Sequence, residues 1–334
     1  MIHDDLLRRL AAANPVRNQR VSGAVRSSGA RVLLERIVAE PAPVVPGTRR
    51  PRRRVWVPVA AVLVGAGVFL GVQILPEGGR GASAAARVLL ATADVAGQVE
   101  AASAEGSYRY LRTEVAETQT LTGEQGVWSA LVDLVREVWV APDGSGRQLQ
   151  ASVHLTFPSP GDRERWEAGG SPALANVVDE EYGPAGLPYF DPSELPTEPE
   201  DLEATLRASI RPSAGGADIQ VFVQVADLLR LPDASPELRA ALFEVAAGLP
   251  RVELVGDTTD EAGRTGTAVA LRSTDLGAET RTELVFDVET ADVLEIRTLI
   301  LEPVAWTPAD PPILFAYRVF LDAGFTDSTD ERPA

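Results

Sequence analysis

Residues Ser235–Leu271 read SPELRAALFEVAAGLPRVELVGDTTDEAGRTGTAVAL, and within them a helical pattern changes directly into a strand pattern. Ser235 is a favoured N-cap residue, and Pro236 suits the first helical position because an N–H there has no helical partner. The apolar face of the predicted helix is Leu238, Ala241, Leu242 and Val245. Gly248 and Pro250 end the helix. The alternation beyond them predicts a pair of strands.

The flanking sequence predicts further strands and helices. The expected strands are Ser107–Leu121, a hairpin over Arg136–Phe157 that turns at residues 142–144, Val252–Gly256, Thr265–Arg272, Arg281–Asp287, Val293–Glu302 and Leu314–Leu321. A helix is expected over Ser83–Ala102, and Pro158–Pro196 is expected to be irregular. Because strands precede and follow a group of helices, the predicted class is α+β with an antiparallel sheet.

Two further segments predict the helices in the middle of the chain. Thr197 and Glu200 have the spacing of a capping box before Leu202 and Leu206. Residues 217–231, ADIQVFVQVADLLRL, allow a strand by alternation but fit a helix better, because their apolar residues recur at helical spacing.

Residues Val55–Leu75 are an apolar run of 21 residues without a charge. A bilayer core of about 30 Å needs about 20 such residues, so the run predicts one transmembrane helix. Five arginines precede it as a topology signal: Arg49, Arg50, Arg52, Arg53 and Arg54. The positive-inside rule then predicts a single-pass cell-membrane protein with residues 1–54 cytoplasmic and residues 76–334 extracytoplasmic. The alternative is a signal peptide cleaved near Gly81–Ala86, although the preceding leader is long for one.

The predicted cytoplasmic segment contains two short helical patterns. The second, ARVLLERIVAE, places four apolar side chains on one side: Leu33, Leu34, Ile37 and Val38. A helix this short is marginal alone, so the segment is either a flexible tail or a docking element that becomes ordered on a partner.

Charge and composition exclude several classes of site. Residues 1–54 carry 12 arginines and four acids, whereas the remainder carries 19 arginines and 44 acids, which argues against nucleic-acid binding. The chain has no cysteine, so thiolate metal sites and cysteine nucleophiles are excluded. His154 is expected on the polar side of a strand, with His3 beyond the apolar run.

The remaining polar clusters suggest no particular chemistry. The acids at 179–181 and at 257, 260 and 261 are expected to be solvated loop charges, with a weak calcium site as the alternative. The strand aromatics Tyr108, Tyr110, Trp139, Phe157, Phe286 and Tyr317 are expected in the core. No catalytic, cofactor-binding or metal-binding residue is predicted.

Several motifs carry a resemblance along nearly the whole chain: LLRRLAAANPV, LLERIVA, WVAPDGSGR, LPTEPEDLEATL, VADLL, ELVFDVETADVLEIRT and YRVFLDAGFTDS, together with the stretch that begins at Ser235. The chain resembles an uncharacterised actinobacterial family of single-pass membrane proteins often encoded beside extracytoplasmic-function sigma factors. Val288 and Ala291 stand where similar chains usually have Pro and Gly. More remotely, the order of elements is similar to the half-barrel fold of lipoprotein carriers and of sigma-E regulators, which implies an apolar cavity.

Together these observations predict a membrane-anchored, non-enzymatic sensor or regulatory domain without a cofactor. The expected partners are the lipid bilayer, a cytoplasmic sigma factor or other regulator at the N-terminal segment, and a lipid or protein ligand outside. One alternative is a membrane-tethered lipid-binding or carrier protein with a half-barrel cavity. A second alternative is an extracytoplasmic hydrolase.

Overall fold

The structure is a computed structural model that describes residues 83–99, 106–124, 126–174, 177–210, 216–274, 277–304 and 309–333. The chain divides into two compact units, and every described residue belongs to the unit that contains residues 82–334. The fold and the sites therefore belong to that unit alone.

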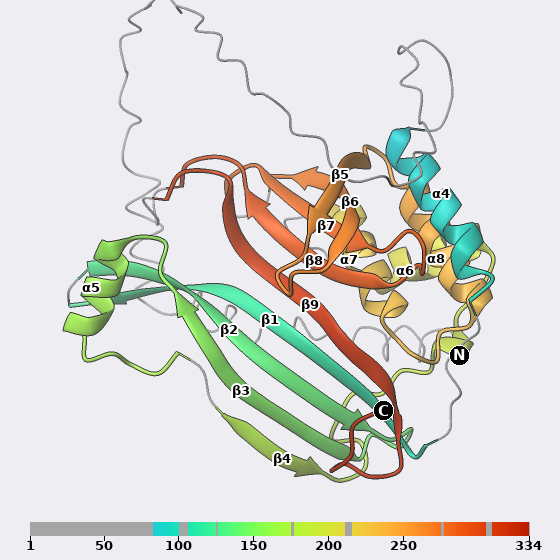
Figure 1. The fold of residues 1–334 in the computed structure, drawn as a ribbon, viewed down its shortest axis with the longest axis horizontal. Helices are drawn as coiled ribbons and strands as arrows, with labels where there is room; N and C mark the ends of the chain where they lie inside the picture. Colours follow the sequence, from blue (N-terminus) through green and yellow to red (C-terminus); the bar gives the residue numbers. More distant parts are fainter. Residues whose placement is uncertain are drawn as a thin grey trace, which may run out of the picture. The chain divides into compact units, whose positions relative to one another are not determined.

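One sheet of nine antiparallel strands organises the described residues (Figure 1). The strands are β1 (Tyr108–Gly123), β2 (Gly126–Val140), β3 (Gly146–Thr156), β4 (Val178–Tyr182), β5 (Glu253–Thr259), β6 (Thr265–Ser273), β7 (Thr280–Phe286), β8 (Val293–Ile300) and β9 (Ile313–Thr326). Their order across the sheet is β4-β3-β2-β1-β9-β8-β7-β6-β5. Two runs of sequential hairpins are therefore joined by β9, the last of the described strands.

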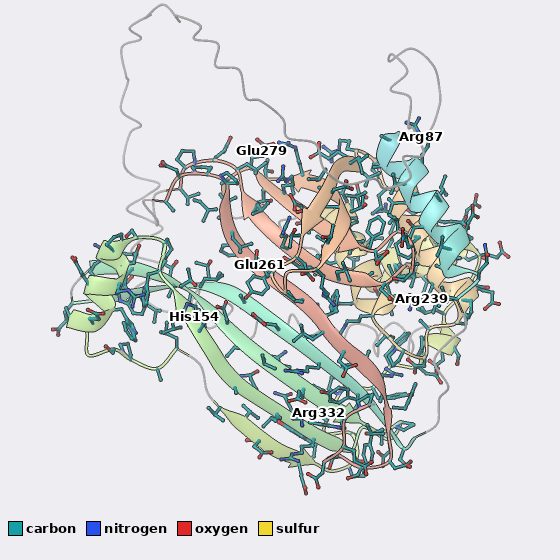
Figure 2. The ribbon with its side chains drawn as sticks, in the orientation of Figure 1. Arg87, His154, Arg239, Glu261, Glu279 and Arg332 are labelled. Atoms are coloured by element: carbon teal, nitrogen blue, oxygen red, sulfur yellow. The ribbon has the colours of Figure 1, made fainter. Side chains whose placement is uncertain are left out.

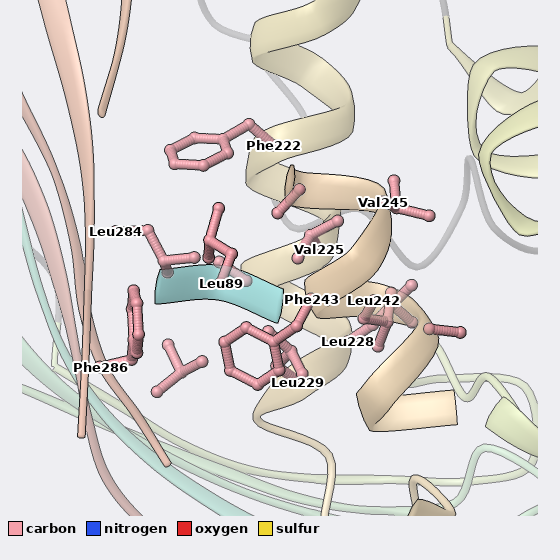
Figure 3. Packing of buried hydrophobic residues seen from close by; sticks show 14 of the residues in the cluster. Leu89, Phe222, Val225, Leu228, Leu229, Leu242, Phe243, Val245, Leu284 and Phe286 are labelled. Carbon is pink, nitrogen blue, oxygen red and sulfur yellow. The ribbon is translucent and has the colours of Figure 1, made fainter. Parts of the chain in front are cut away.

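Helices cover the part of one sheet face that β6, β7 and β8 form. They are α4 (Ala84–Ala96), α6 (Pro199–Ser209), α7 (Gly216–Leu229) and α8 (Pro236–Gly248), whereas α5 (Pro160–Ala168) packs beside β2. The main apolar core lies between the four helices and the sheet, and Figure 3 shows Phe243 of α8 against Phe286 of β7. Their ring centroids are 5.5 Å apart in an edge-on arrangement. We call this face of the sheet the helix-side face.

The helix predicted from Ser235 is confirmed as α8. The Ser235 hydroxyl accepts a hydrogen bond from the Leu238 N–H at 3.2 Å, as an N-cap residue should. Leu242 is fully buried, whereas Glu244 on the other side is exposed. The helical alternative for residues 217–231 is also confirmed, because α7 covers Gly216–Leu229.

The strand aromatics follow the core prediction in most cases. Tyr110, Trp139, Phe286 and Tyr317 are buried, whereas Tyr108 and Phe157 are only partly buried.

The turn after β7 contains Ala291, which stands where similar chains usually have Gly. Ala291 adopts a left-handed φ of 59°, a conformation that glycine reaches without steric cost. The backbone of this turn therefore keeps the conformation that favours glycine although the residue is alanine.

Other local predictions were wrong or incomplete. The capping box fails, because Glu198 is the N-cap of α6 and no side chain caps that end. The segment expected to be irregular contains α5, capped by Ser159, and the short strand β4. Strand β2 begins at Gly126, well before the predicted hairpin, since residues 128–133 are buried on both faces and lack alternation.

The predicted fold class also requires correction. The described chain is a mostly antiparallel β-sheet with a few helices, in place of a membrane-anchored, half-barrel α+β fold. Among the residues that the structure describes, no helix is long and apolar enough to cross a membrane. The predictions of a transmembrane helix, of a single-pass membrane location and of the cytoplasmic and extracytoplasmic sides are therefore withdrawn. The segment 55–75 itself lies outside the described residues.

Candidate functional site

The helix-side face continues from β8 across β9, β1, β2 and β3. The register places Phe320 of β9 opposite Thr113 of β1, Thr113 opposite Arg136 of β2, and Arg136 opposite Gln150 of β3. Directly paired residues point to the same side of a sheet. Because Phe320 belongs to the main core, this row of side chains lies on the helix-side face.

Apolar side chains flank that row, and most of them do not pack against the core. Leu111 pairs with Val138, and Val115 pairs with Leu134. All four are only partly buried. Of the described residues in β1, β2 and β3, Leu111 alone packs against the main core cluster. The part of the face formed by β1, β2 and β3 therefore presents apolar surface that the helices leave uncovered. We call Leu111, Val115, Leu134 and Val138 the apolar strip.

Arg109 closes the end of this face near the start of β1. Its guanidinium donates to the Phe190 carbonyl at 2.9 Å and to the Asp233 carboxylate at 2.5 Å, and it lies 4.3 Å from the ring centroid of Tyr189. Arg109 is only 4% exposed. Burial raises the pKa of Asp233, while Arg109 acts against that rise. This ion pair fixes the loop before η1 (Pro192–Glu194) and the loop after α7 onto the sheet.

A second ion pair joins the end of α7 to β9. Arg318 donates to Asp227, and the Nε of Arg230 lies 3.6 Å from the same carboxylate. Arg230 also lies 5.8 Å from the ring centroid of Phe320. Burial lowers the pKa of Arg230 to about 10, and the positive charges of Arg318, Arg109 and Arg136 contribute in the same direction. One aspartate therefore serves two guanidinium groups.

Arg136 stands between these ion pairs without a carboxylate of its own. Its Nε and Nη2 both donate to the Gln150 side-chain oxygen, at 3.1 and 2.8 Å. Within the described residues, no carboxylate oxygen lies at ion-pairing distance from Arg136. Burial and the nearby charge of Arg318 lower the pKa of Arg136. We call Arg109, Arg136, Arg230 and Arg318 the arginine cluster.

The charge of the arginine cluster differs from that of the surrounding chain. Four guanidinium groups share two carboxylates, Asp227 and Asp233, which leaves an excess of positive charge. Residues 55–334 as a whole carry 19 arginines against 44 acids. Partly buried like charges repel more strongly than solvated ones, so an arrangement of this kind costs free energy in the unliganded fold.

The opposite face of the sheet holds a different polar group. The Tyr317 hydroxyl lies 2.9 Å from Glu114 Oε1 and 3.2 Å from Asp133 Oδ1. Burial raises the pKa of Asp133. His154, labelled in Figure 2, pairs with Asp133 in the register and is exposed, as expected for the polar side of a strand.

The turn between β5 and β6 packs against the same opposite face. Glu261, labelled in Figure 2, donates its backbone N–H to the buried Glu295 carboxylate at 2.9 Å. Arg297 donates to Thr259 O at 3.2 Å and also forms an ion pair with Glu283 at 2.7 Å. Burial raises the pKa of Glu295 to about 7, and the neighbouring acids 260 and 261 contribute to the rise.

The acids expected to be solvated differ in their environments. Asp257, Glu261 and residues 179–181 are exposed, but 179–181 lie in β4 and not in a loop. Asp260 is 4% exposed and pairs with Arg264 at 2.6 Å, so the solvated-loop prediction is wrong for Asp260. No group of three metal-ligating side chains is arranged around a common point in the described part of the chain.

The predicted partner-binding and topology residues cannot be placed. Leu33, Leu34, Ile37 and Val38, and the five arginines at 49, 50 and 52–54, lie outside the described residues. The arginine cluster, in contrast, was not predicted from the sequence. Its one signal was Arg136, which follows residues 127–135, a mostly apolar segment interrupted by Ser129 and Asp133.

No protein-family model matches the chain. No curated protein matches it significantly in sequence.

Proposed function

We propose that the described domain is a non-enzymatic sensor or regulatory module that binds a lipid-like small molecule on the uncovered helix-side face of β1, β2 and β3. The observation that carries this proposal is the apolar strip, which is partly exposed beside the arginine cluster. Apolar side chains with a few convergent polar groups are typical of small-molecule sites. Of the strip only Leu111 packs against the main core, so a ligand gives the other three side chains a partner.

A binding role is favoured over catalysis by the way in which the polar groups of this face are engaged. Arg109 and Arg318 are held by Asp233 and Asp227, and the side chain of Arg136 is anchored by Gln150. Arginine stays protonated across the physiological range, so it is a poor general base and a good recognition group. The hydrolase alternative would require a nucleophile or paired carboxylates beside the strip.

Titration of the full chain with an uncharged amphiphile, decanol, tests the proposal directly. Leu134→Asp places a charge in the strip and should weaken decanol binding at least tenfold, because the ligand tail would have to desolvate the carboxylate. Val127→Asp is the matched control, since Val127 lies on the same strand but is 46% exposed. Unfolding curves establish that both variants are folded. Equal affinities of both variants for decanol would refute the proposed site.

The regulatory partner is the second part of this proposal, and it rests on the sequence alone. Leu33, Leu34, Ile37 and Val38 form an apolar stripe that suits the groove of a regulator such as a sigma factor. Ile37→Asp should abolish capture of a purified sigma factor by the full chain, whereas Arg36→Ala should leave capture unchanged. Identical capture by both variants would remove the stripe from the proposal.

A further inference from the structure

We propose that Arg136, supported by Arg318, binds an anionic oxygen group, a carboxylate or a phosphate, at the polar end of the ligand. The inference rests on the proposed ligand site and adds the chemistry of its recognition. Arg136 is then the residue that determines specificity for a charged ligand over a neutral one.

Arg136 has hydrogen-bonding capacity suited to an anion. A guanidinium has five N–H donors, and Arg136 directs its Nε and one Nη group to a single oxygen of Gln150. Gln150 is 9% exposed and holds the planar group in one orientation. Oriented guanidinium donors suit the two oxygens of a carboxylate or phosphate.

The position of Arg318 points to the same ligand chemistry. Arg318 pairs with Val115 of β1, and Val115 in turn pairs with Leu134 of β2. Leu134 is two residues before Arg136 on the same strand, so Arg318 and Arg136 are neighbours on this face. Asp227 fixes Arg318 from the end of α7 and has to neutralise Arg230 as well. One carboxylate cannot balance two guanidinium groups, and Arg136 adds a third positive charge. An anion placed between Arg136 and Arg318 reduces this imbalance.

The electrostatic response of the cluster supports the same conclusion. Positive charges lower one another's pKa: that of Arg136 is lowered by Arg318, after the larger effect of burial. Such repulsion is unfavourable in the free domain, and the attraction of a bound anion to both guanidinium groups offsets it. The arrangement therefore resembles a site that is completed by its ligand.

The apolar strip distinguishes the ligand from a free inorganic anion. Leu111, Val115, Leu134 and Val138 surround the row that contains Arg136. A molecule that satisfies both features has one anionic end and one apolar chain. Fatty-acid carboxylates and alkyl phosphates share this chemistry, and the two are separated by experiment.

Calorimetric titration of the full chain with decanoate, decyl phosphate, decanol and inorganic phosphate tests the inference. At least one of the two charged amphiphiles should bind about tenfold or more tightly than decanol. Arg136→Gln should remove that advantage, so that the charged amphiphiles bind no more tightly than decanol. Arg136→Lys keeps the charge but not the planar pair of donors, so it should retain part of the preference for charged amphiphiles over decanol. The matched control is Arg163→Gln, because Arg163 is exposed on α5, and it should change nothing.

The possible outcomes separate the inference from the proposed function. Equal binding of decanol and both charged amphiphiles overturns the anion site and leaves the ligand-binding face intact. Anion binding that survives Arg136→Gln also overturns the inference. Inorganic phosphate that binds as tightly as decyl phosphate supports the anion site but refutes the apolar part of the proposed function. Absence of binding by all four compounds refutes both.

Discussion

The two halves of the helix-side face differ although they belong to one continuous sheet. Over β6, β7 and β8 the face is apolar and is covered by α4, α7 and α8, with Leu284 and Phe286 fully buried. Over β1, β2 and β3 the same face carries Arg136, Gln150 and partly exposed apolar residues. Both halves have antiparallel geometry, so the difference lies in what covers them.

This difference suggests a division of tasks within one sheet. A helix-covered half gains stability by removing apolar area from water, at about 25 cal/mol per Å². The other half keeps apolar area and excess charge where a ligand can reach them, which costs stability in the free state. Substitutions in each half and the pH dependence of stability test that division, from the largest expected effect to the smallest.

Truncation of Leu242 should have the largest effect, because its side chain is fully buried in the helix-covered half. Leu242→Ala should lower the free energy of unfolding by about 2–5 kcal/mol. Glu244→Ala is the control on the exposed side of α8 and should change it by less than about 0.5 kcal/mol. Urea unfolding measures both, and a loss below about 1 kcal/mol at Leu242 would show that the stability resides elsewhere.

Stability should fall as the pH rises from about 4.5 to about 7 because of Glu295. Burial raises its pKa from 4.5 to about 7, so the folded state binds the proton more tightly than the unfolded chain. The free energy of unfolding therefore falls as the pH rises, by on the order of 3 kcal/mol in full.

Comparison with Glu295→Gln isolates this contribution. The variant should lose less stability than the wild type between pH 5 and pH 8, because its amide does not titrate, and urea unfolding at the two pH values measures the difference. Glu244→Gln is the exposed control. Parallel pH profiles of wild type and Glu295→Gln would contradict the assignment of this titration to Glu295.

Truncation in the apolar strip should cost little. Val138 is partly exposed and belongs to no core cluster of the described residues. Val138→Ala should therefore lower the free energy of unfolding by about 1 kcal/mol or less. Val225→Ala removes the same two methyl groups at a fully buried position of α7 and should cost clearly more. Equal losses in thermal melts would remove the contrast between the two halves.

Removal of the charge at Arg136 should slightly stabilise the free domain. Arg136→Gln relieves the repulsion by Arg318, and we expect the free energy of unfolding to rise by about 0.5–1 kcal/mol. Arg163→Gln, on the exposed surface of α5, should show no gain. Thermal melts without ligand provide the measurement. A loss of stability at Arg136 would mean that its bonds to Gln150 outweigh the repulsion.

Local patterns predicted the local elements well. The apolar spacing and the Ser235 cap identified α8, and alternation identified most strands. Strand β4 was missed because its residues, VDEEY, have little apolar content and gain order from pairing with β3. The first half of β2 was missed because residues 128–133 are buried on both faces, which removes the alternation that marks a strand.

The candidate site could not be predicted in the same way. Arg136, Arg230 and Arg318 come from β2, the end of α7 and β9, which are distant in the sequence. Their proximity depends on the placement of β9 beside β1, a long-range pairing with no local signal. Arg136 beyond a mostly apolar segment was visible in the sequence, but its partners were not.

The position of β9 has a consequence for the order in which this protein is made. During synthesis, β1 to β4 and β5 to β8 can each pair with their neighbours in sequence as they emerge. Strand β9, at Ile313–Thr326, then pairs with both β1 and β8 and completes the sheet. A chain that ends before Ile313 would have two separate sheets, each with an unpaired edge open to aggregation. Translation must therefore pass Thr326 before the two runs of strands become one sheet.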